Sequence, residues 1–248
     1  MTERQRMDEG RLDLSVVRVH RQEITQALLG ETILLTDEQW GMPSRLPGWT
    51  RAHIASHLAR NADGLTRVVQ QLLDGTPTSL YADEASARSD IERGSERTAL
   101  ELQVDLDASA NRLHEHFEEL LQMPPDRLVA LTPTVTVRLD HLPIVRINEL
   151  VLHHIDLDIG YTHQNVDPQA AAWLLAYNAA RIGRNSAYPA IRLMSDSGVE
   201  TIIGGPGRPQ VVHGPDSLLL AWLTRRLDDG TDNNLPELAN TQLLPALA

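Results

Sequence analysis

The chain has 248 residues, enough for one large domain or two modest ones, and its 42% hydrophobic and 23% charged residues are typical of folded globular proteins. Its formal net charge of −12 disfavours a nucleic-acid partner or an anionic membrane surface, because both are bound mainly through clustered cations. All 22 Lys and Arg residues are arginine and there is no cysteine, which excludes disulfides, a cysteine nucleophile and Schiff-base chemistry on a lysine.

The sequence also shows no sign of membrane insertion or export. No apolar run approaches the roughly 20 residues needed to span a bilayer. The first residues lack the apolar core of a signal peptide. We therefore expect a cytoplasmic protein, a monomer or a small homo-oligomer, with no nucleic-acid partner and no membrane partner.

Long helices are predicted in the first two thirds of the chain. Apolar residues recur at helical spacing over about 12–35, and a second helix is expected over 51–73. The polar region 81–94 is expected to form a loop with a short helix. An amphipathic helix over 95–123 follows, closed by two prolines, and the stretch 134–139 alternates like a short strand.

The next predicted helix differs from the others because it is apolar nearly all the way round. Pro143 suits its first turn, and the pattern ends near Gly160. At 100° per residue, the aliphatic side chains between 144 and 159 cover most of its circumference. We therefore expect this helix to be buried rather than to lie on the surface.

The last third of the chain changes to a mixed pattern. One helix is expected over 168–183, followed by three short strands within "AIRLMSD", "VETIIGG" and "RPQVVHG". A last helix over 217–227 is expected to have Asp216 as its N-cap and Gly230 just past its end. The tail after Gly230 has no regular pattern.

These patterns predict two domains. Four main helices in about 160 residues favour an antiparallel four-helix bundle, which we place at residues 1–163. The helices and strands that follow predict a smaller α+β domain at residues 164–248. The expected fold class is therefore mainly α plus α+β.

One narrow polar stripe interrupts the apolar helix. Its members follow one another at steps of three, four and three, and so lie on one side of the helix: Arg146, Glu149, His153 and Asp156. A helix that is otherwise apolar can bury such a stripe only against polar partners. We expect the stripe to face a polar cavity inside the bundle.

Part of this stripe has the spacing of metal ligands. Glu149 and His153 are four residues apart, so a carboxylate oxygen and an imidazole nitrogen can bind one metal ion from successive turns, although such a pair also occurs on helix surfaces without a metal. A third ligand can come from "HIASH", in which His53 and His57 share one helix face. Three protein ligands with an open position are typical of catalytic zinc, although manganese, iron and nickel bind the same donors.

Two stretches, "LPGWTRAHIASHLARNA" and "VRINELVLHHIDLDIGY", resemble the mycothiol-dependent maleylpyruvate isomerase family, within the wider DinB-like metal-binding bundles. The order of the domains matches as well, so the resemblance covers most of the chain. It implies a DinB-like bundle, a sterol-carrier-like C-terminal domain, and a zinc site made by His57, Glu149 and His153.

The resemblance also suggests roles for four further residues. His53 matches a histidine that is not a ligand, and it either supports the site or bonds to the first turn of its own helix. Asp156 either orients a histidine ligand or pairs with an arginine. Arg226 is expected, together with Arg146, to bind carboxylates of the substrate or the thiol; the alternative for Arg226 is a solvated arginine at a helix end.

The function implied by the resemblance is cis–trans isomerisation of maleylpyruvate to fumarylpyruvate with mycothiol as the thiol cofactor. Reversible addition of a thiolate lets the double bond rotate, and zinc would keep the sulfur deprotonated. The expected partners are a small dicarboxylate substrate and a low-molecular-weight thiol. Two alternatives remain open: a mycothiol S-transferase that acts on another electrophile, and a non-enzymatic protein that binds an apolar ligand in its C-terminal domain.

Overall fold

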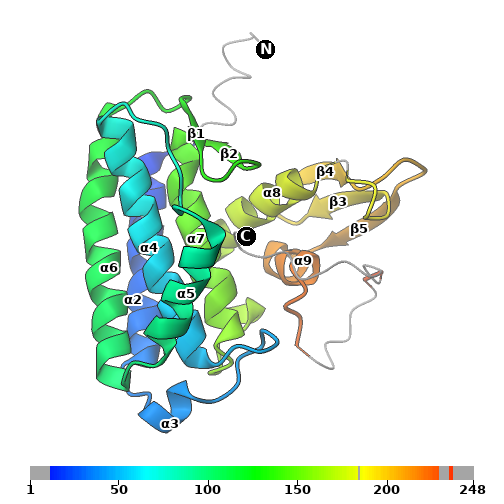
Figure 1. The fold of residues 1–248 in the computed structure, drawn as a ribbon. Coiled ribbons are helices and arrows are strands. Elements are labelled where there is room, and N and C mark those ends of the chain that lie inside the picture. Colours follow the sequence, from blue (N-terminus) through cyan, green and yellow to red (C-terminus); the bar gives the residue numbers. More distant parts are fainter. Residues whose placement is uncertain (1–11, 184, 229–234, 237–248) are drawn as a thin grey trace. The chain divides into compact units, whose positions relative to one another are not determined.

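The computed structural model describes residues 12–183, 185–228 and 235–236. The chain forms two compact units, Met1–Leu157 and Asp158–Ala248, both drawn in Figure 1. This division falls after Leu157, whereas the sequence places the domain boundary after residue 163. Gly230 and most of the tail predicted to be irregular lie outside the described residues. No described helix is both long and apolar enough to cross a membrane.

The first unit is built on four long helices, α2 (Leu14–Thr32), α4 (Arg51–Leu73), α6 (Ala99–Glu119) and α7 (Leu142–Asp156). They pack as a closed ring in which α2 contacts α6, α6 contacts α4, α4 contacts α7, and α7 contacts α2. Figure 1 shows them side by side, from blue to green. The predicted four-helix bundle is confirmed.

The central helix α7 is buried along its whole length, as its apolar circumference predicts. Pro143 lies in its first turn, where a missing backbone N–H costs no hydrogen bond. The helix ends at Asp156 rather than near Gly160, because Asp158 has φ +54° and a left-handed residue does not continue a right-handed helix.

Smaller elements complete the first unit. The region expected to be a loop with a short helix contains α5 (Glu84–Ser95). This helix packs closely on α4 at Gly94, where a Cβ would lie only 2.2 Å from Oγ of Ser56. The remaining elements among the described residues of this unit are α3 (Asp37–Trp40), the short helices η1 (Leu120–Gln122) and η2 (Leu139–His141), and an antiparallel pair of strands, β1 (Leu128–Ala130) and β2 (Thr136–Arg138).

The loop that follows α4 lies directly against that helix because Gly64 has no side chain. A Cβ at this position would lie 2.7 Å from the backbone oxygen of Leu80. The same oxygen accepts a hydrogen bond from Nη1 of Arg67 at 2.9 Å, and the Leu80 N–H donates to the carbonyl of Leu131 at 2.8 Å. These contacts hold the next residue, Tyr81, beside α4.

The second unit is the predicted α+β domain. Where the structure describes this unit, its helices are η3 (His163–Asn165), α8 (Pro168–Ile182) and α9 (Asp216–Leu223), and its strands are β3 (Ile191–Ser195), β4 (Glu200–Ile203) and β5 (Gln210–Gly214). The sheet order is β4-β3-β5, with β4 antiparallel and β5 parallel to β3. Alternate strand residues pack with the two long helices into one core, which includes Leu175, Ile191, Leu193, Val212, Leu219 and Trp222.

The last helix differs from its prediction at both ends. Pro215 is the N-cap, so the predicted cap Asp216 is instead the first helical residue, and its carboxylate accepts a hydrogen bond from Oγ of Ser197 at 2.7 Å. The helix ends at Leu223, four residues before the predicted end at 227. Arg225 has φ +58°, which is incompatible with further right-handed helix.

Candidate metal centre

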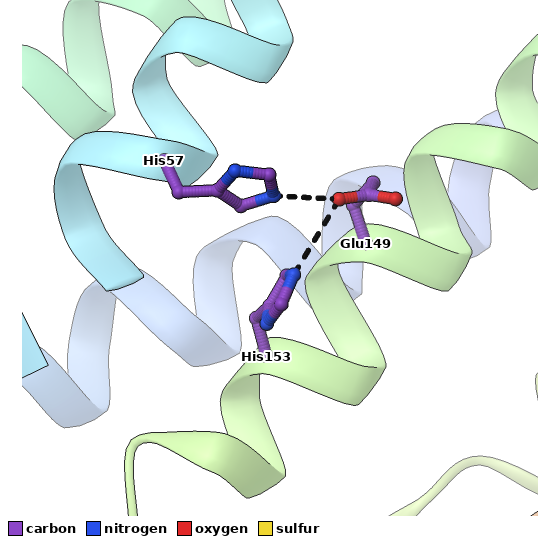
Figure 2. Close-up of side chains that lie close together, drawn as sticks. All are labelled: His57, Glu149 and His153. Carbon is purple, nitrogen blue, oxygen red and sulfur yellow. Dashed lines mark hydrogen bonds and ion pairs between the residues drawn. The ribbon is translucent and has the colours of Figure 1, made fainter. Parts of the chain in front are cut away.

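Three polar side chains from two helices meet inside the bundle: His57 of α4, and Glu149 and His153 of α7 (Figure 2). Nε2 of His57 lies 2.9 Å from Oε2 of Glu149, and Nε2 of His153 lies 3.6 Å from the same oxygen. One potential ligand atom from each residue lies within 4.8 Å of the other two, and all three residues are buried. The structure thus brings together the three residues that were predicted to bind a metal.

These three residues suit a divalent metal ion. Oε2 of Glu149 contacts both histidines, but Oε1 is buried without a hydrogen-bond partner among the described residues. Buried carboxylate oxygens are normally satisfied, so an unpaired one indicates a missing partner. Two imidazoles and one carboxylate are also the donor set of many catalytic zinc sites. The residues therefore fit a zinc ion.

The surroundings of Glu149 and His57 favour the protonation states that bind metal. Burial by itself would raise the pKa of Glu149, but hydrogen bonds with His153 and His57 lower it to about 2. Burial lowers the pKa of His57, and this effect exceeds the opposing influence of Glu149. A metal ion binds carboxylate and neutral imidazole, which are the forms that these shifts favour for Glu149 and His57.

Asp156 lies beside His153 on the same helix. Nδ1 of His153 lies 2.9 Å from Oδ2 of Asp156, and both side chains are buried. The carboxylate of Asp156 can only accept a hydrogen bond, so Nδ1 of His153 carries the proton. Nε2 then faces Glu149 with its lone pair available to bind a metal ion. Although burial lowers the pKa of His153, hydrogen bonds with Asp156 and Glu149 raise it overall. This contact is the one that the predicted orienting role of Asp156 requires.

His53 lies at the start of α4 and is not part of the cluster of three. Its Nδ1 accepts a hydrogen bond from the N–H of Thr50 at 3.2 Å, and its Nε2 lies 3.2 Å from Oε2 of Glu92. Of its two predicted roles, these contacts match bonding to the first helical turn. Trp49 connects it with the cluster, since the indole stacks on the His53 ring at 6.1 Å and lies 5.6 Å from the His57 ring.

Arg146 forms hydrogen bonds with the neighbouring helix, α4. Its side chain is 2% exposed, and Nη1 donates to the carbonyl of Leu58 at 2.8 Å and to Oδ1 of Asn61 at 2.7 Å. Burial lowers its pKa to about 10, and the charge of Glu149 opposes that shift. The polar stripe of α7 therefore faces α4. Asn61 was not predicted, although its position four residues after His57 places it on the same helix face.

Arg226 belongs to the second unit. Its side chain is 3% exposed, and Nη1 donates to the carbonyl of Thr224 at 2.9 Å. It is therefore buried just beyond α9, unlike the solvated helix-end arginine considered as its alternative.

Comparison with known proteins places this fold among characterised ones. A family described as "Mycothiol maleylpyruvate isomerase N-terminal domain" matches residues 21–158. The crystal structure of the mycothiol-dependent maleylpyruvate isomerase shares the fold with a TM-score of 0.77 at 22% identity, over 92% of this chain and 96% of that chain. A variant of that isomerase with a histidine replaced by alanine matches over the same shares with a TM-score of 0.77 at 21% identity. A search of curated proteins gave no match.

Proposed function

The chain belongs to the mycothiol maleylpyruvate isomerase family, and on this premise we propose that it converts maleylpyruvate to fumarylpyruvate with mycothiol as its thiol cofactor. The buried cluster of His57, Glu149 and His153 carries the proposal, because it offers the ligands for a zinc ion. The fold shared with solved structures named as mycothiol-dependent maleylpyruvate isomerase supports it.

The reaction requires a temporary loss of double-bond character. A thiolate adds to one alkene carbon, and the alkene electron pair moves into the adjacent carbonyl as an enolate. The new carbon–carbon single bond rotates. The electron pair then returns, the carbon–sulfur bond breaks, and the trans product and the thiolate are released. Because the chain contains no cysteine, the sulfur has to come from a small molecule.

The residues of the cluster prepare the place for that sulfur. When bound, zinc supplies a Lewis acid that keeps a thiol deprotonated near neutral pH. His57 and His153 add no charge when neutral, so Glu149 offsets only one of the two charges of a divalent ion. An anionic sulfur is therefore favoured beside the cluster. Asp156 holds the proton of His153 on Nδ1 and so keeps Nε2 available as a ligand.

Arg226 is our candidate for binding a carboxylate of the substrate or the thiol, because the guanidinium fork matches a carboxylate in two parallel hydrogen bonds. We assign Arg146 a structural role instead, because Nη1 bonds to two oxygens of α4, those of Leu58 and Asn61. An Arg226→Ala variant is expected to raise the KM for the substrate or for the thiol. Unchanged KM values for both would contradict this assignment.

The proposed activity is tested by incubating zinc-loaded protein with maleylpyruvate, with and without mycothiol, and following both isomers by chromatography. Conversion is expected only with the thiol, and the His57→Ala variant under the same conditions is the matched control. Accumulation of a stable thiol conjugate would instead support an S-transferase. Failure of folded, zinc-loaded protein to convert maleylpyruvate would reject this substrate.

A further inference from the structure

A second site lies in the first unit, outside the metal cluster. A cavity of about 410 Å³, open to solvent on one side, is lined by α4, α5 and the residues flanking α5, and its volume is typical of small-molecule sites. From α4 it is lined by Arg60, Asp63 and Arg67, which share one helix face because they are three and four residues apart. None of the three cluster residues lines it.

The wall of this cavity is electropositive, although the whole chain carries a net charge of −12. Four arginines and two aspartates line it. Two residues of α6 pair with lining residues from outside the cavity: Asp105 contacts Arg60, and Arg112 contacts Asp63. These two add one charge of each sign, so an excess of two positive charges remains. A ligand with two negative charges would balance it.

Arg67 has a guanidinium that is not engaged by a carboxylate. Each of the other lining arginines forms ion pairs, namely Arg60 with Asp63 and Asp105, Arg97 with Asp105, and Arg93 with Asp90. Arg67 donates Nη1 to the carbonyl of Leu80 at 2.9 Å, and within the described part of the chain it forms no ion pair. Its remaining N–H groups are therefore available to a ligand carboxylate.

A second carboxylate can be bound from the α5 side. The side chain of Arg93 is 71% exposed and that of its partner Asp90 is 50% exposed. An ion pair this exposed contributes little free energy, so a ligand carboxylate can replace Asp90 at low cost. Tyr81 lines the same cavity, and burial, followed by the charge of Glu149, raises the pKa of its hydroxyl although a hydrogen bond with Asn61 opposes the shift. The phenol therefore stays protonated and can donate a hydrogen bond.

We propose that this cavity binds a small dicarboxylate, with Arg67 and Arg93 each taking one carboxylate and the Tyr81 hydroxyl donating to the ligand. Three features favour such a ligand. The wall has an excess of positive charge, the guanidinium of Arg67 forms no ion pair among the described residues, and the ion pair of Arg93 is weak. The site does not require the metal ion or the thiol, and it is separate from the centre at which the isomerisation is proposed.

The probe for this site is succinate, compared with butyrate, which has the same number of carbons but one carboxylate. Isothermal titration of the full chain at low ionic strength is expected to show succinate binding both with zinc and after treatment with a chelator. Butyrate should bind at least about tenfold more weakly, because it loses one charge-assisted contact. Arg67→Gln is expected to weaken succinate binding by about tenfold or more. Arg67→Lys should fall between, since it keeps the charge but loses the fork.

Arg192→Gln is the matched control, because Arg192 is an exposed arginine of β3 paired with Glu200, and its loss changes the net charge equally. It should leave succinate affinity unchanged, and circular dichroism should show that every variant is folded. Failure of folded wild-type protein to bind succinate would overturn the proposal. Equal affinity in wild type and Arg67→Gln would also overturn it, as would binding that disappears in His57→Ala but persists in Arg67→Gln. These outcomes are independent of turnover and so do not test the proposed isomerase activity.

Discussion

Oδ2 of Asp156 lies 2.9 Å from Nδ1 of His153, one turn earlier on α7. This contact decides which nitrogen of the imidazole carries the proton, and hence which one faces Glu149. Both residues lie on the same buried helix, so the contact is made within α7, while α4 adds the third side chain of the cluster. We propose that this contact orients His153 for metal binding.

Asp156→Asn is expected to weaken zinc binding by about 10- to 100-fold, because the amide no longer stabilises the tautomer that leaves Nε2 free. Competition between the protein and a chromophoric chelator measures the affinity. The substitution preserves side-chain size, so thermal unfolding should show a folded protein. An affinity equal to that of wild type would mean that Asp156 does not support the site.

Substitutions of the cluster residues and of His53 are expected to have different effects on the zinc content of the protein. His57→Ala and Glu149→Gln are each expected to lose bound zinc, because the site then has only two protein ligands or lacks its carboxylate. His53→Ala should retain zinc and lose only about 0.5–2 kcal/mol of stability, since it bonds to the helix start. Atomic absorption after gel filtration measures the metal. Zinc retained in His57→Ala, or lost in His53→Ala, would contradict the assigned ligands.

Arg146→Met is expected to lower the free energy of unfolding by roughly 2–4 kcal/mol, because it removes two buried hydrogen bonds to α4 and a positive charge near Glu149. Urea denaturation with fluorescence detection measures the change. A variant of wild-type stability with a raised KM for substrate would instead support the carboxylate-binding role expected from the sequence.

The acid stability of the first unit should depend on Asp140. This fully buried carboxylate accepts hydrogen bonds from Nε of Arg138 at 3.0 Å and from Nδ1 of His141 at 2.8 Å. Burial alone would raise its pKa, but these partners lower it below the ordinary value. A lowered folded-state pKa means that the carboxylate stabilises the fold above its unfolded pKa of about 3.9 and that this contribution is lost as the pH falls through the folded-state pKa.

Asp140→Asn is therefore expected to cost about 1–3 kcal/mol at neutral pH and to flatten the loss of stability below about pH 4. Urea midpoints of wild type and variant between pH 3 and pH 7 measure both effects. The two curves should converge at the acidic end. Parallel curves over the whole range would show that Asp140 does not control the acid transition.

The cluster of His57, Glu149 and His153 was predictable because its members occupy regular positions on helices. Spacing fixes which side chains share a face, so Glu149 and His153 could be paired from the sequence alone. Spacing does not fix which helix packs opposite that face or in what register. The preference for His57 over His53 therefore rested on the family resemblance.

Other features depend on tertiary contacts that leave no periodic signal. Arg146 lies on the predicted stripe, but the sequence could not show that the carbonyl of Leu58 would take its hydrogen bond. Tyr81 lies in a loop, and a loop has no repeating pattern from which the direction of a side chain can be predicted. The early end of α9 depends on a left-handed arginine, Arg225, and arginine carries none of the turn signal that glycine would give.

The close contact at Gly64 affects the arginine-lined cavity but involves none of the three cluster residues, His57, Glu149 and His153. A single methyl group there would meet the carbonyl of Leu80, a backbone atom that can retreat only if the whole loop moves. Tyr81 would move with it, whereas the facing residues of α4 and α7 would keep their register. Gly64→Ala would thus reshape the cavity proposed to bind a dicarboxylate, so the ligand range of that cavity can change during divergence without substitution of His57, Glu149 or His153.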